Sequence, residues 1–460
     1  MNFFARKNII LIMGDVLITF LSAYAGVYLR FYYMGHSSGS VLQKYAPLLP
    51  KAVAFSVFMI FICFFLDLYS AEKTDGRKEV LLKVMFAGFF TSLALGAFYY
   101  FVPDVQLGRG MLFMSVLISV MLQSVWHIGY GIFLKLPLVA RKVLILGTGP
   151  FAKTMGNILR SNGNGFALSG YVNCVGEPVH VPGSSIVGNG DGILAIALKE
   201  KVQKIVVSLS ERRGTLPVRE ILDCKLQGID IIDGPSFYEQ LTGKLLIENM
   251  NPSHLIFSDG FRITPTRRCV KRMVDVVLAV IGIVVSLPII ILVAVLIKLD
   301  SRGPVLFKQE RIGENEKIFI VYKFRTMIDN AEKHTGPVWS RTGDNRITRV
   351  GRILRKLRLD EIPQLFNVIC GNMSFIGPRP ERPFFVESLK KQIPYYSERH
   401  CVKPGITGWA QVRYEYGDSI EDAMEKLRYD LYYIKYQSIF LDILIVLDTV
   451  KVILFGRGGR

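Results

Sequence analysis

Residues 276–297 read VVLAVIGIVVSLPIIILVAVLI, and this stretch decides how the rest of the chain relates to a membrane. It has 22 residues and no charged side chain, and about 20 apolar residues are enough for a helix to cross a bilayer. Ser286, Leu287 and Pro288 interrupt it. Because proline removes a helix hydrogen bond and clashes with the preceding turn, we expect the helix to bend or break at Pro288.

Clusters of basic residues flank both ends of this stretch. They are Arg267, Arg268, Lys271 and Arg272 before it, and Lys298, Arg302, Lys308 and Arg311 after it. Lys and Arg beside apolar helices concentrate on the cytoplasmic side of a membrane. The sequence therefore predicts a re-entrant helix within residues 274–299, which enters the membrane, breaks at Pro288 and returns, with the freed carbonyl groups met by Ser286 or by neighbouring protein. A Pro-kinked helix that crosses the membrane is the alternative.

Four further apolar stretches follow one another in the first 136 residues. They are Ile9–Phe31, Leu48–Leu66, Val80–Val102 and Met111–Leu134. A cleaved signal peptide would be one short apolar run, so this repetition predicts a bundle of four transmembrane helices in residues 1–136, and the distribution of Lys and Arg places both of its ends in the cytoplasm. Asp15 and Asp67 lie in or beside these helices. A carboxylate inside a membrane is a candidate functional group, but a solvated side chain or one paired with another helix is the favoured interpretation.

The segment 141–265 has the alternating pattern of an open α/β sheet. Strands are expected at Lys142–Thr148, Lys204–Leu209 and Ile229–Asp233. Gly147 and Gly149 follow the first strand in a pattern that resembles the fingerprint of dinucleotide-binding Rossmann domains, in which glycines let backbone N–H groups approach a pyrophosphate. The acidic ribose partner would have to be Glu177. A Rossmann-like domain with a structural or regulatory role is favoured over one that binds a cofactor, since a fold alone does not carry a function.

Composition narrows the class of protein. A chain of 460 residues exceeds the ~100–200 residues of one typical domain. With 50% hydrophobic and only 20% charged residues, it is neither a disordered polymer nor an ordinary soluble enzyme. The six cysteines are far apart, so neither a disulfide framework nor a zinc site is expected, and a reducing compartment fits.

The net charge of +18 is concentrated near the C-terminus. Residues 266–460 hold 32 Lys and Arg against 21 Asp and Glu, a balance of +11. This segment is therefore expected to meet an acidic partner, such as membrane lipid or a phosphorylated molecule. Nucleic acid is not expected, because membrane segments surround the basic residues.

A basic run in this segment leads to two neighbouring carboxylates. Arginines recur at every third position, at Arg346, Arg349, Arg352, Arg355 and Arg358, with Lys356 added. On a helix this spacing makes a basic stripe that fits lipid headgroups or phosphate. Asp360, Glu361 and Pro363 follow, and this order predicts that Asp360 caps a new helix or that the chain bends sharply there. Neighbouring carboxylates suit phosphoryl transfer, because one can attack phosphorus and the other can hold Mg²⁺.

Four motifs occur in order around these carboxylates. They are Lys323–Met327 (KFRTM), Leu357–Leu365 (LRLDEIPQL), Asn372–Pro380 (NMSFIGPRP) and Lys403–Val412 (KPGITGWAQV). Together they closely resemble the bacterial sugar transferases, the monotopic phosphoglycosyl transferases that start the synthesis of exopolysaccharide, capsule or O-antigen. The resemblance is dense over residues 266–460. The four apolar stretches and the α/β segment are similar, more loosely, to the long polyprenyl glycosylphosphotransferase form of the family.

The resemblance implies a multidomain membrane protein whose C-terminal catalytic domain, residues 266–460, is mostly α-helical and carries the re-entrant helix. It implies that Asp360 attacks the β-phosphate of a UDP-sugar, expels UMP and holds the phosphosugar until undecaprenyl phosphate accepts it. Glu361 would ligate Mg²⁺, and Ser286 and Pro288 match the family's helix break.

Four basic side chains are candidates for binding phosphate. Guanidinium groups are planar bidentate donors, which makes Arg325, Arg358 and Arg379 reasonable clamps for the diphosphate or the acceptor, and Lys323 of the first motif is assigned the same role. Since UDP-sugars are cytoplasmic, we expect a bacterial inner-membrane protein with its catalytic domain on the cytoplasmic face. The long family form is also compatible with a homodimer.

Two other functions stay open. One is a membrane-tethered NAD-dependent enzyme that modifies nucleotide sugars, although neither Tyr171 nor Tyr238 has a Lys four residues further on. The other is a non-enzymatic scaffold for polysaccharide assembly. The sugar is not identified, because after Val412 the residues Arg413–Asp418 replace the Asn-Gly-Arg type of turn that many relatives have. The last apolar stretch, Ile439–Phe455, fits either an amphipathic helix on the membrane surface or a core helix.

Overall fold

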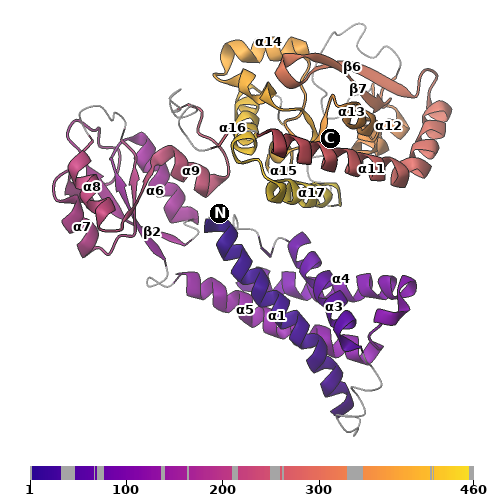
Figure 1. Cartoon of the computed structure of the whole chain (residues 1–460), viewed down its shortest axis with the longest axis horizontal. Coiled ribbons are helices and arrows are strands. Elements are labelled where there is room, and N and C mark those ends of the chain that lie inside the picture. The colour runs from indigo at the N-terminus through magenta and orange to yellow at the C-terminus, as the bar shows by residue number, and fades with distance from the viewer. Residues whose placement is uncertain are drawn as a thin grey trace. The chain divides into compact units, whose positions relative to one another are not determined.

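The computed structural model describes residues 3–32, 47–66, 68–69, 77–135, 140–162, 165–209, 216–248, 260–261, 264–328, 346–414, 417 and 419–454. The chain divides into two compact units, Met1–Leu241 and Thr242–Arg460. Figure 1 shows long helices and an α/β domain in the first unit, and mostly helices with short strands in the second.

Long apolar helices form the N-terminal part of the first unit. They are α1 (Phe3–Tyr32), α3 (Leu48–Phe65), α4 (Arg77–Phe101) and α5 (Arg109–Lys135), with a short 3₁₀ turn, η1 (Pro103–Val105), between α4 and α5. Among the described residues, five helices are long and apolar enough to cross a membrane: Ile9–Arg30, Leu48–Phe65, Val80–Phe101 and Arg109–Phe133 within these four, and Pro265–Asp300 in the second unit. The four predicted N-terminal stretches therefore form helices with closely matching bounds.

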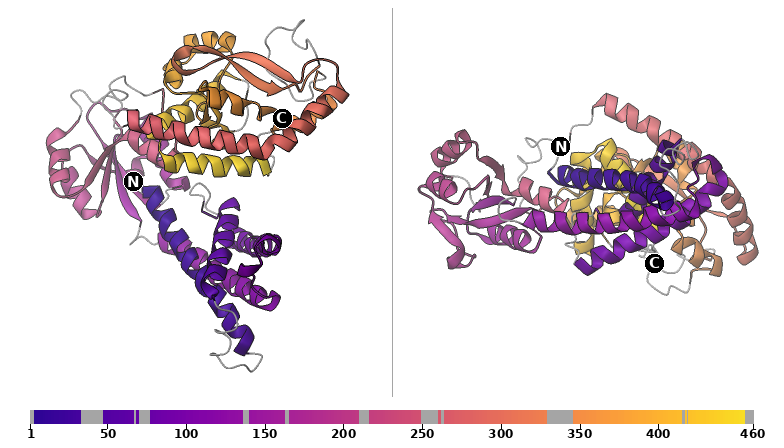
Figure 2. Two further views of the ribbon diagram at one scale, coloured as in Figure 1. Left: turned by 45° about the vertical axis from the view of Figure 1, so that its right-hand side comes forward. Right: turned by 90° about the horizontal axis from the view of Figure 1, so that it is seen from below.

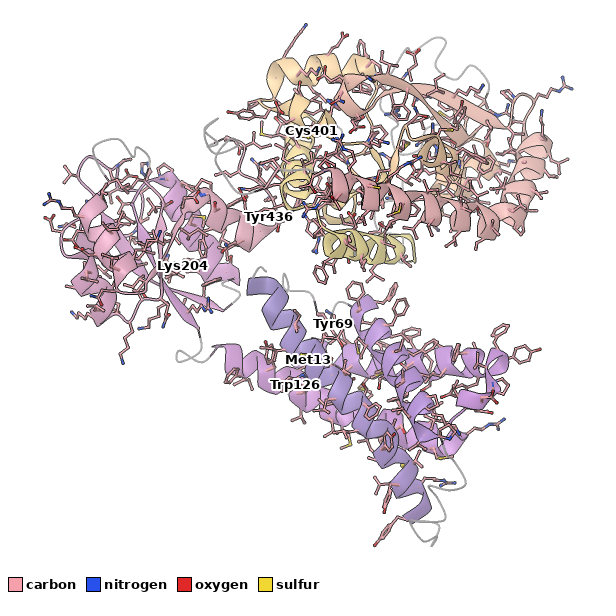
Figure 3. All side chains as sticks on the ribbon, in the orientation of Figure 1. Met13, Tyr69, Trp126, Lys204, Cys401 and Tyr436 are labelled. Atoms are coloured by element: carbon pink, nitrogen blue, oxygen red, sulfur yellow. The ribbon has the colours of Figure 1, made fainter. Side chains whose placement is uncertain are left out.

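Small residues let α1 and α5 approach each other closely. A Cβ atom built on Gly14 would lie 2.4 Å from the Trp126 ring, and one built on Gly26 would lie 2.2 Å from Ser115 Oγ. Trp126 also donates a hydrogen bond from its ring nitrogen to the Leu11 carbonyl, at 3.2 Å. Close backbone approach through small residues is typical of helix pairs in membranes. Trp126 is labelled in Figure 3.

Asp15 is fully buried in this helical region. Its Oδ2 accepts a hydrogen bond from the Tyr69 hydroxyl at 2.6 Å and lies 2.8 Å from His127 Nε2 (Figure 3 labels Tyr69). The carboxylate is therefore paired with a neighbouring helix, α5, and is not solvated. Asp67 lies outside the described residues.

The α/β domain contains an open sheet, as the sequence predicts, and the sheet has five parallel strands in the order β3-β2-β1-β4-β5. Its elements are β1 (Arg141–Leu146), α6 (Pro150–Asn162), β2 (Phe166–Asn173), η2 (Gly183–Ser185), β3 (Ile186–Asn189), α7 (Ile193–Lys199), β4 (Lys204–Val207), α8 (Val218–Leu226), β5 (Asp230–Asp233) and α9 (Gly234–Thr242). The three predicted strands correspond to β1, β4 and β5. The strands β2 and β3 add to them, and buried apolar side chains of β1 and β4 form the core.

The second unit contains one very long helix, two short sheets and a set of short helices. Its elements are α11 (Pro265–Asp300), β6 (Leu306–Ile312), η3 (Glu314–Glu316), β7 (Ile318–Phe324), α12 (Arg349–Lys356), η4 (Leu359–Glu361), α13 (Gln364–Cys370), β8 (Ser374–Ile376), α14 (Pro383–Gln392), η5 (Tyr396–Cys401), β9 (Gly405–Thr407), α15 (Trp409–Arg413), α16 (Ile420–Tyr436) and α17 (Ile439–Leu454). Residues 242–248 pack on this unit, since Leu245 and Ile247 lie in the same core cluster as Trp409, whose ring nitrogen donates to the Gly243 carbonyl.

The helix α11 is continuous through Pro288 but visibly bent (Figure 2). Ser286 Oγ donates to the Gly282 carbonyl at 2.6 Å, a contact that often accompanies bending. The predicted bend is therefore present, whereas the predicted break is not, because a proline removes only one bond of the helical ladder. Both halves pack on the second unit, through Ala279 before the bend and through Val293 after it.

The last helix, α17, has one face in the core of the second unit and another face that is exposed. Leu441 and Ile445 are buried in the core of the second unit, whereas Ile439, Phe440 and Ile443 are exposed. A salt bridge of 3.0 Å joins Lys271 of α11 to Asp442 of α17, and the two helices lie side by side in Figures 1 and 2.

Glycines bring two of the sequence motifs into direct backbone contact. The strands β8 and β9 pair in parallel, and the pairing continues as Gly377 N–H donates to the Thr407 carbonyl and Gly405 N–H donates to the Pro378 carbonyl, both at 2.9 Å. A Cβ atom on Gly405 would lie 2.1 Å from the Gly377 nitrogen. The motifs NMSFIGPRP and KPGITGWAQV therefore form one structural element.

We expect Gly405→Ala to destabilise the second unit. The added methyl would meet backbone atoms that cannot rotate away, and overpacking of this kind costs about 1–3 kcal/mol. Thermal unfolding of the purified full-length protein should show a melting temperature several degrees below wild type. Gly183→Ala is the control, because a Cβ atom there meets no atom within 4 Å. An unchanged melting temperature for Gly405→Ala would contradict the close approach of β8 and β9.

Candidate active site

Asp360 and Glu361 lie in the single 3₁₀ turn η4, which joins α12 to α13. Arg358 precedes this turn with a φ of 54°, in the left-handed region that residues other than glycine rarely adopt. The predicted sharp bend is therefore present. The predicted helix cap is not, since Pro363 occupies the N-cap position of α13 and Asp360 lies inside η4. Helical backbone runs from η4 almost directly into α13, so no free helix end is left for Asp360 to cap.

Glu361 is held by two cations from separate motifs. Its Oε1 accepts a hydrogen bond from Lys323 Nζ at 3.0 Å, at the end of β7, and one from Arg379 Nη2 at 2.6 Å, in the loop after β8. Burial raises the pKa of Glu361, but the Arg379 guanidinium and the Lys323 ammonium outweigh it and hold that pKa well below the usual range. Glu361 is therefore ionised at neutral pH. Two of the four predicted phosphate ligands lie in direct contact with the carboxylate pair.

The pKa of Asp360 is shifted in the opposite direction. Within the described part of the chain, its carboxylate makes no hydrogen bond or ion pair. Burial and the neighbouring Glu361 charge raise its pKa, and Lys323, Arg355 and Arg379 counteract this only in part. When the environments of two carboxyl groups move their pKa values in opposite directions, the groups are suited to different chemical roles.

The hydrogen bonds of the Arg325 side chain go to residues outside this site. It is buried, with Nη1 donating to the Arg302 carbonyl at 2.9 Å and Nη2 donating to the carbonyl and hydroxyl of Ser301, both at 2.8 Å. These carbonyls directly follow α11, since Ser301 is its C-cap and Arg302 is the next residue. Arg325 therefore holds the end of the long helix. From the sequence, Arg325 is expected to bind phosphate because a guanidinium group has a suitable donor geometry. The residue type does not show which acceptor that group meets.

The basic run before the carboxylates is only partly helical. The helix α12 covers Arg349–Lys356, so the predicted stripe extends beyond it at both ends. Arg355 turns inward and donates from Nε to Thr326 Oγ1 at 2.9 Å. Arg352 and Lys356 are exposed on the surface of α12, and Arg358 sits at the left-handed position beside η4.

A buried ion pair that the sequence did not indicate supports the Arg379 loop. Arg399 of η5 donates from Nη2 to Asp430 of α16 at 2.7 Å and to the Arg379 carbonyl at 3.0 Å. Both partners of the ion pair are buried. Arg311 of β6 adds a bond of 3.0 Å to the Pro380 carbonyl of the same loop. No motif predicts the Arg399–Asp430 pair, because only the tertiary fold brings η5 and α16 together.

Removal of one partner of this pair should be strongly destabilising. Asp430→Ala leaves the Arg399 guanidinium buried without a counter-charge, a change that costs about 3–5 kcal/mol. The melting temperature should fall, and the double variant Arg399→Met with Asp430→Leu should recover much of the loss. Glu398→Ala, at an exposed acid of the same segment, is the control. A melting temperature for Asp430→Ala equal to that of the control would contradict this role.

The donor set fits a magnesium ion that is shared with a substrate. Magnesium commonly binds one or two carboxylates together with phosphate oxygens and water. Both cation contacts of Glu361 go to Oε1, and neither Oε2 nor the Asp360 carboxylate receives a hydrogen bond from the described residues. Those residues contain no group of three or more His, Cys, Asp or Glu that could hold a metal ion by themselves.

Gly147 is explained by packing within the α/β domain. Gly147 has a φ of +121°, and a Cβ atom there would lie 2.6 Å from the Ser208 carbonyl oxygen at the end of β4. The Thr148 hydroxyl lies 2.9 Å from Asn173 Oδ1, and the Thr148 carbonyl accepts from His180 N–H at 2.8 Å. The segment after β2 therefore occupies hydrogen-bonding groups of the loop between Gly147 and Gly149. This arrangement favours a structural role for the loop.

Comparison with known proteins gives consistent matches. The sequence model described as "Bacterial sugar transferase" matches residues 266–456. The chain is 44% identical over 242 residues to UDP-N-acetylgalactosamine-undecaprenyl-phosphate N-acetylgalactosaminephosphotransferase of Aeromonas hydrophila, a match that covers 53% of this chain and 56% of that relative. It is 34% identical over 329 residues to undecaprenyl-phosphate glucose phosphotransferase of Komagataeibacter xylinus, with 70% of this chain and 60% of the relative covered.

A third relative matches along nearly its whole length. UDP-glucose:undecaprenyl-phosphate glucose-1-phosphate transferase of Xanthomonas campestris pv. campestris is 30% identical over 439 residues, which cover 90% of this chain and 89% of that protein. The N-terminal helices and the α/β domain therefore match a relative together with the C-terminal unit, although the chain covers less than two thirds of the first two relatives.

Proposed function

The chain belongs to the bacterial sugar transferase family, and on that basis we propose that it transfers a sugar 1-phosphate from a UDP-sugar to undecaprenyl phosphate with release of UMP. The observation that carries the proposal is the electrostatic difference between two neighbouring carboxylates, a paired and ionised Glu361 and an unpaired Asp360 with a raised pKa. The names of the relatives make N-acetylgalactosamine and glucose the first sugars to test.

In the first step, an Asp360 carboxylate oxygen attacks the β-phosphorus of the donor. A bond forms between that oxygen and phosphorus, the bond from phosphorus to the oxygen bridging the two phosphates breaks, and UMP leaves with the bridging oxygen. Among the described residues none donates a hydrogen bond to the Asp360 carboxylate, so its oxygens are not engaged by those residues. The raised pKa makes the ionised carboxylate a stronger nucleophile than an ordinary aspartate.

In the second step, a phosphate oxygen of undecaprenyl phosphate attacks the same phosphorus and the Asp360 carboxylate leaves, which gives a diphosphate-linked sugar. Lys323 and Arg379 would stabilise the negative charge of the reacting phosphates, as preorganised cations do in phosphoryl transfer. Glu361 would hold Mg²⁺, which neutralises charge on the diphosphate. Arg325 is excluded from this role by its contacts with Ser301 and Arg302.

We expect Asp360→Asn to lower UMP release by at least about 10³-fold, because the amide cannot act as the nucleophile. The assay follows UMP release from UDP-N-acetylgalactosamine and UDP-glucose by the purified full-length protein with Mg²⁺ and undecaprenyl phosphate. Glu398→Gln, a neutralised surface acid, should keep wild-type activity.

A second measurement tests the covalent intermediate. With donor labelled in the β-phosphate and no acceptor, label should remain on wild-type protein and be absent from Asp360→Asn. Wild-type activity in Asp360→Asn would show that the nucleophile is another group. Activity that depends on Asp360 without label on the wild-type protein would favour direct transfer between donor and acceptor.

We also propose that α11 enters the membrane from the cytoplasm and returns, which keeps the catalytic unit on the cytoplasmic face of a bacterial inner membrane. Both ends of α11 are bound by the same unit, as Asp275 Oδ1 accepts from Phe375 N–H at 2.9 Å and Asp300 Oδ2 accepts from Val350 N–H at 3.1 Å. The side chains beside the bend are apolar and exposed, with Val284 at 66% and Val285 at 72%. This geometry supports insertion of the bend into the bilayer.

Cysteine labelling can test this topology. Two full-length variants report on the two ends of α11. One keeps Cys269, which is already exposed, as its single cysteine. The other has all six native cysteines replaced and carries Arg302→Cys. A membrane-impermeant maleimide should label both in inverted vesicles and neither in intact cells. A variant with only Gln106→Cys, in the loop after α4, should show the opposite pattern. Labelling of Cys269 and of Arg302→Cys from opposite sides would mean that α11 crosses the membrane.

A further inference from the structure

A pocket at the start of α11 carries an excess of positive charge. Its volume is about 510 Å³, including the part that is open to solvent, and it lies between α11, η3, β8 and α16. Five basic side chains line it, against two carboxylates: Arg267, Arg268, Lys271, Arg272 and Lys403, against Asp275 and Glu314. Neither the carboxylate pair of the candidate active site nor its two cation partners are among the lining residues. This basic pocket is therefore a separate feature of the second unit.

Some of these charges are already used by the protein and others are not. Arg272 donates to the carbonyls of Val368 and Ile369, at 2.5 and 2.7 Å, and so caps the end of α13. In contrast, within the part of the chain that the structure describes, the side chains of Arg267, Arg268 and Lys403 make no hydrogen bond or ion pair. Three cations of the pocket are thus available to an external anion.

The helix itself adds to this positive potential. The first turn of α11 contains no acidic residue, and Thr264 at the N-cap accepts a hydrogen bond from Arg267 N–H at 3.3 Å. A helix N-terminus carries partial positive charge, so cations there are unfavourable and an anion is stabilising. Four cations in the first eight residues of α11 are therefore an arrangement that a bound anion would stabilise.

The surroundings of the pocket indicate which kind of anion fits. Next along α11, the side chains of Met273 and Val277 are exposed by 57% and 55%, and Phe440 of the adjacent α17 is exposed by 61%. A soluble anion would leave this apolar surface in water, whereas a lipid would cover it with acyl chains while its phosphate meets the cations. We propose that the basic pocket binds the phosphodiester headgroup of an anionic phospholipid. Bound there, the lipid fixes the depth at which α11 begins in the membrane interface.

Native mass spectrometry of the detergent-purified full-length protein tests this proposal. The variant Arg268→Gln with Lys403→Gln should bind phosphatidylglycerol at least about tenfold more weakly than wild type, since each basic contact near a membrane surface contributes about 1 kcal/mol. Neither side chain makes a hydrogen bond or ion pair with the described residues, so the fold should be kept. The control variant Lys317→Gln with Lys391→Gln, which neutralises two exposed lysines of the same unit, should bind like wild type.

Three competitors separate the sources of the phosphate group. Phosphatidylcholine and inorganic phosphate at millimolar concentration should not displace phosphatidylglycerol from the wild-type protein. Equal phosphatidylglycerol binding by the pocket variant and the control would overturn the proposal. Displacement by inorganic phosphate would make this a site for free phosphate, and stronger displacement by undecaprenyl phosphate than by phosphatidylglycerol would make it a site for the phosphomonoester lipid. Either result would also overturn the proposal.

Discussion

The shared hydrogen bonds of the Glu361 carboxylate are the interaction on which the candidate site depends. One oxygen accepts from both Lys323 and Arg379, so the end of β7, the turn η4 and the loop after β8 meet at a single atom. A buried carboxylate without such partners would cost several kcal/mol, and each cation alone would be a buried charge. The three segments therefore have to assemble together, and the position of the adjacent Asp360 follows from the same contacts.

The same unit ties this site to the long helix α11. Asp300 at the end of α11 accepts from the Val350 amide of α12, the helix that leads into η4, and Arg325, next to the end of β7, binds the carbonyls that follow Asp300. The carboxylate pair therefore has a fixed position relative to the apolar helix. If the chain acts as proposed, this connection would fix the position of Asp360 relative to the helix that enters the membrane. The Arg399–Asp430 pair has a related role, since it fixes the loop that carries Arg379.

Much of this organisation could be predicted from the sequence, because apolar periodicity and motif order are local properties. The four N-terminal helices and three strands of the α/β domain are of this kind. The group that a side chain binds depends on the tertiary fold and is not a local property. The sequence could not show that Arg325 binds a helix end, since clamps and caps use the same guanidinium donors. It also predicted a break at Pro288, whereas the remaining hydrogen bonds keep α11 continuous and only bent.

The different states of Asp360 and Glu361 follow from the geometry of the turn that holds them. In a 3₁₀ turn successive side chains point about 120° apart, so neighbouring carboxylates face different surroundings. Glu361 meets both cations and stays ionised, whereas burial and then the fixed negative charge of Glu361 oppose ionisation of Asp360 next to it. Among the described residues Lys323 and Arg379 bond to Glu361 and not to Asp360, so they act on Asp360 only through space and offset its raised pKa only in part. The protein thus obtains a firmly anionic group and a more basic carboxylate from two consecutive residues, which is the division of roles that a metal ligand and a nucleophile require.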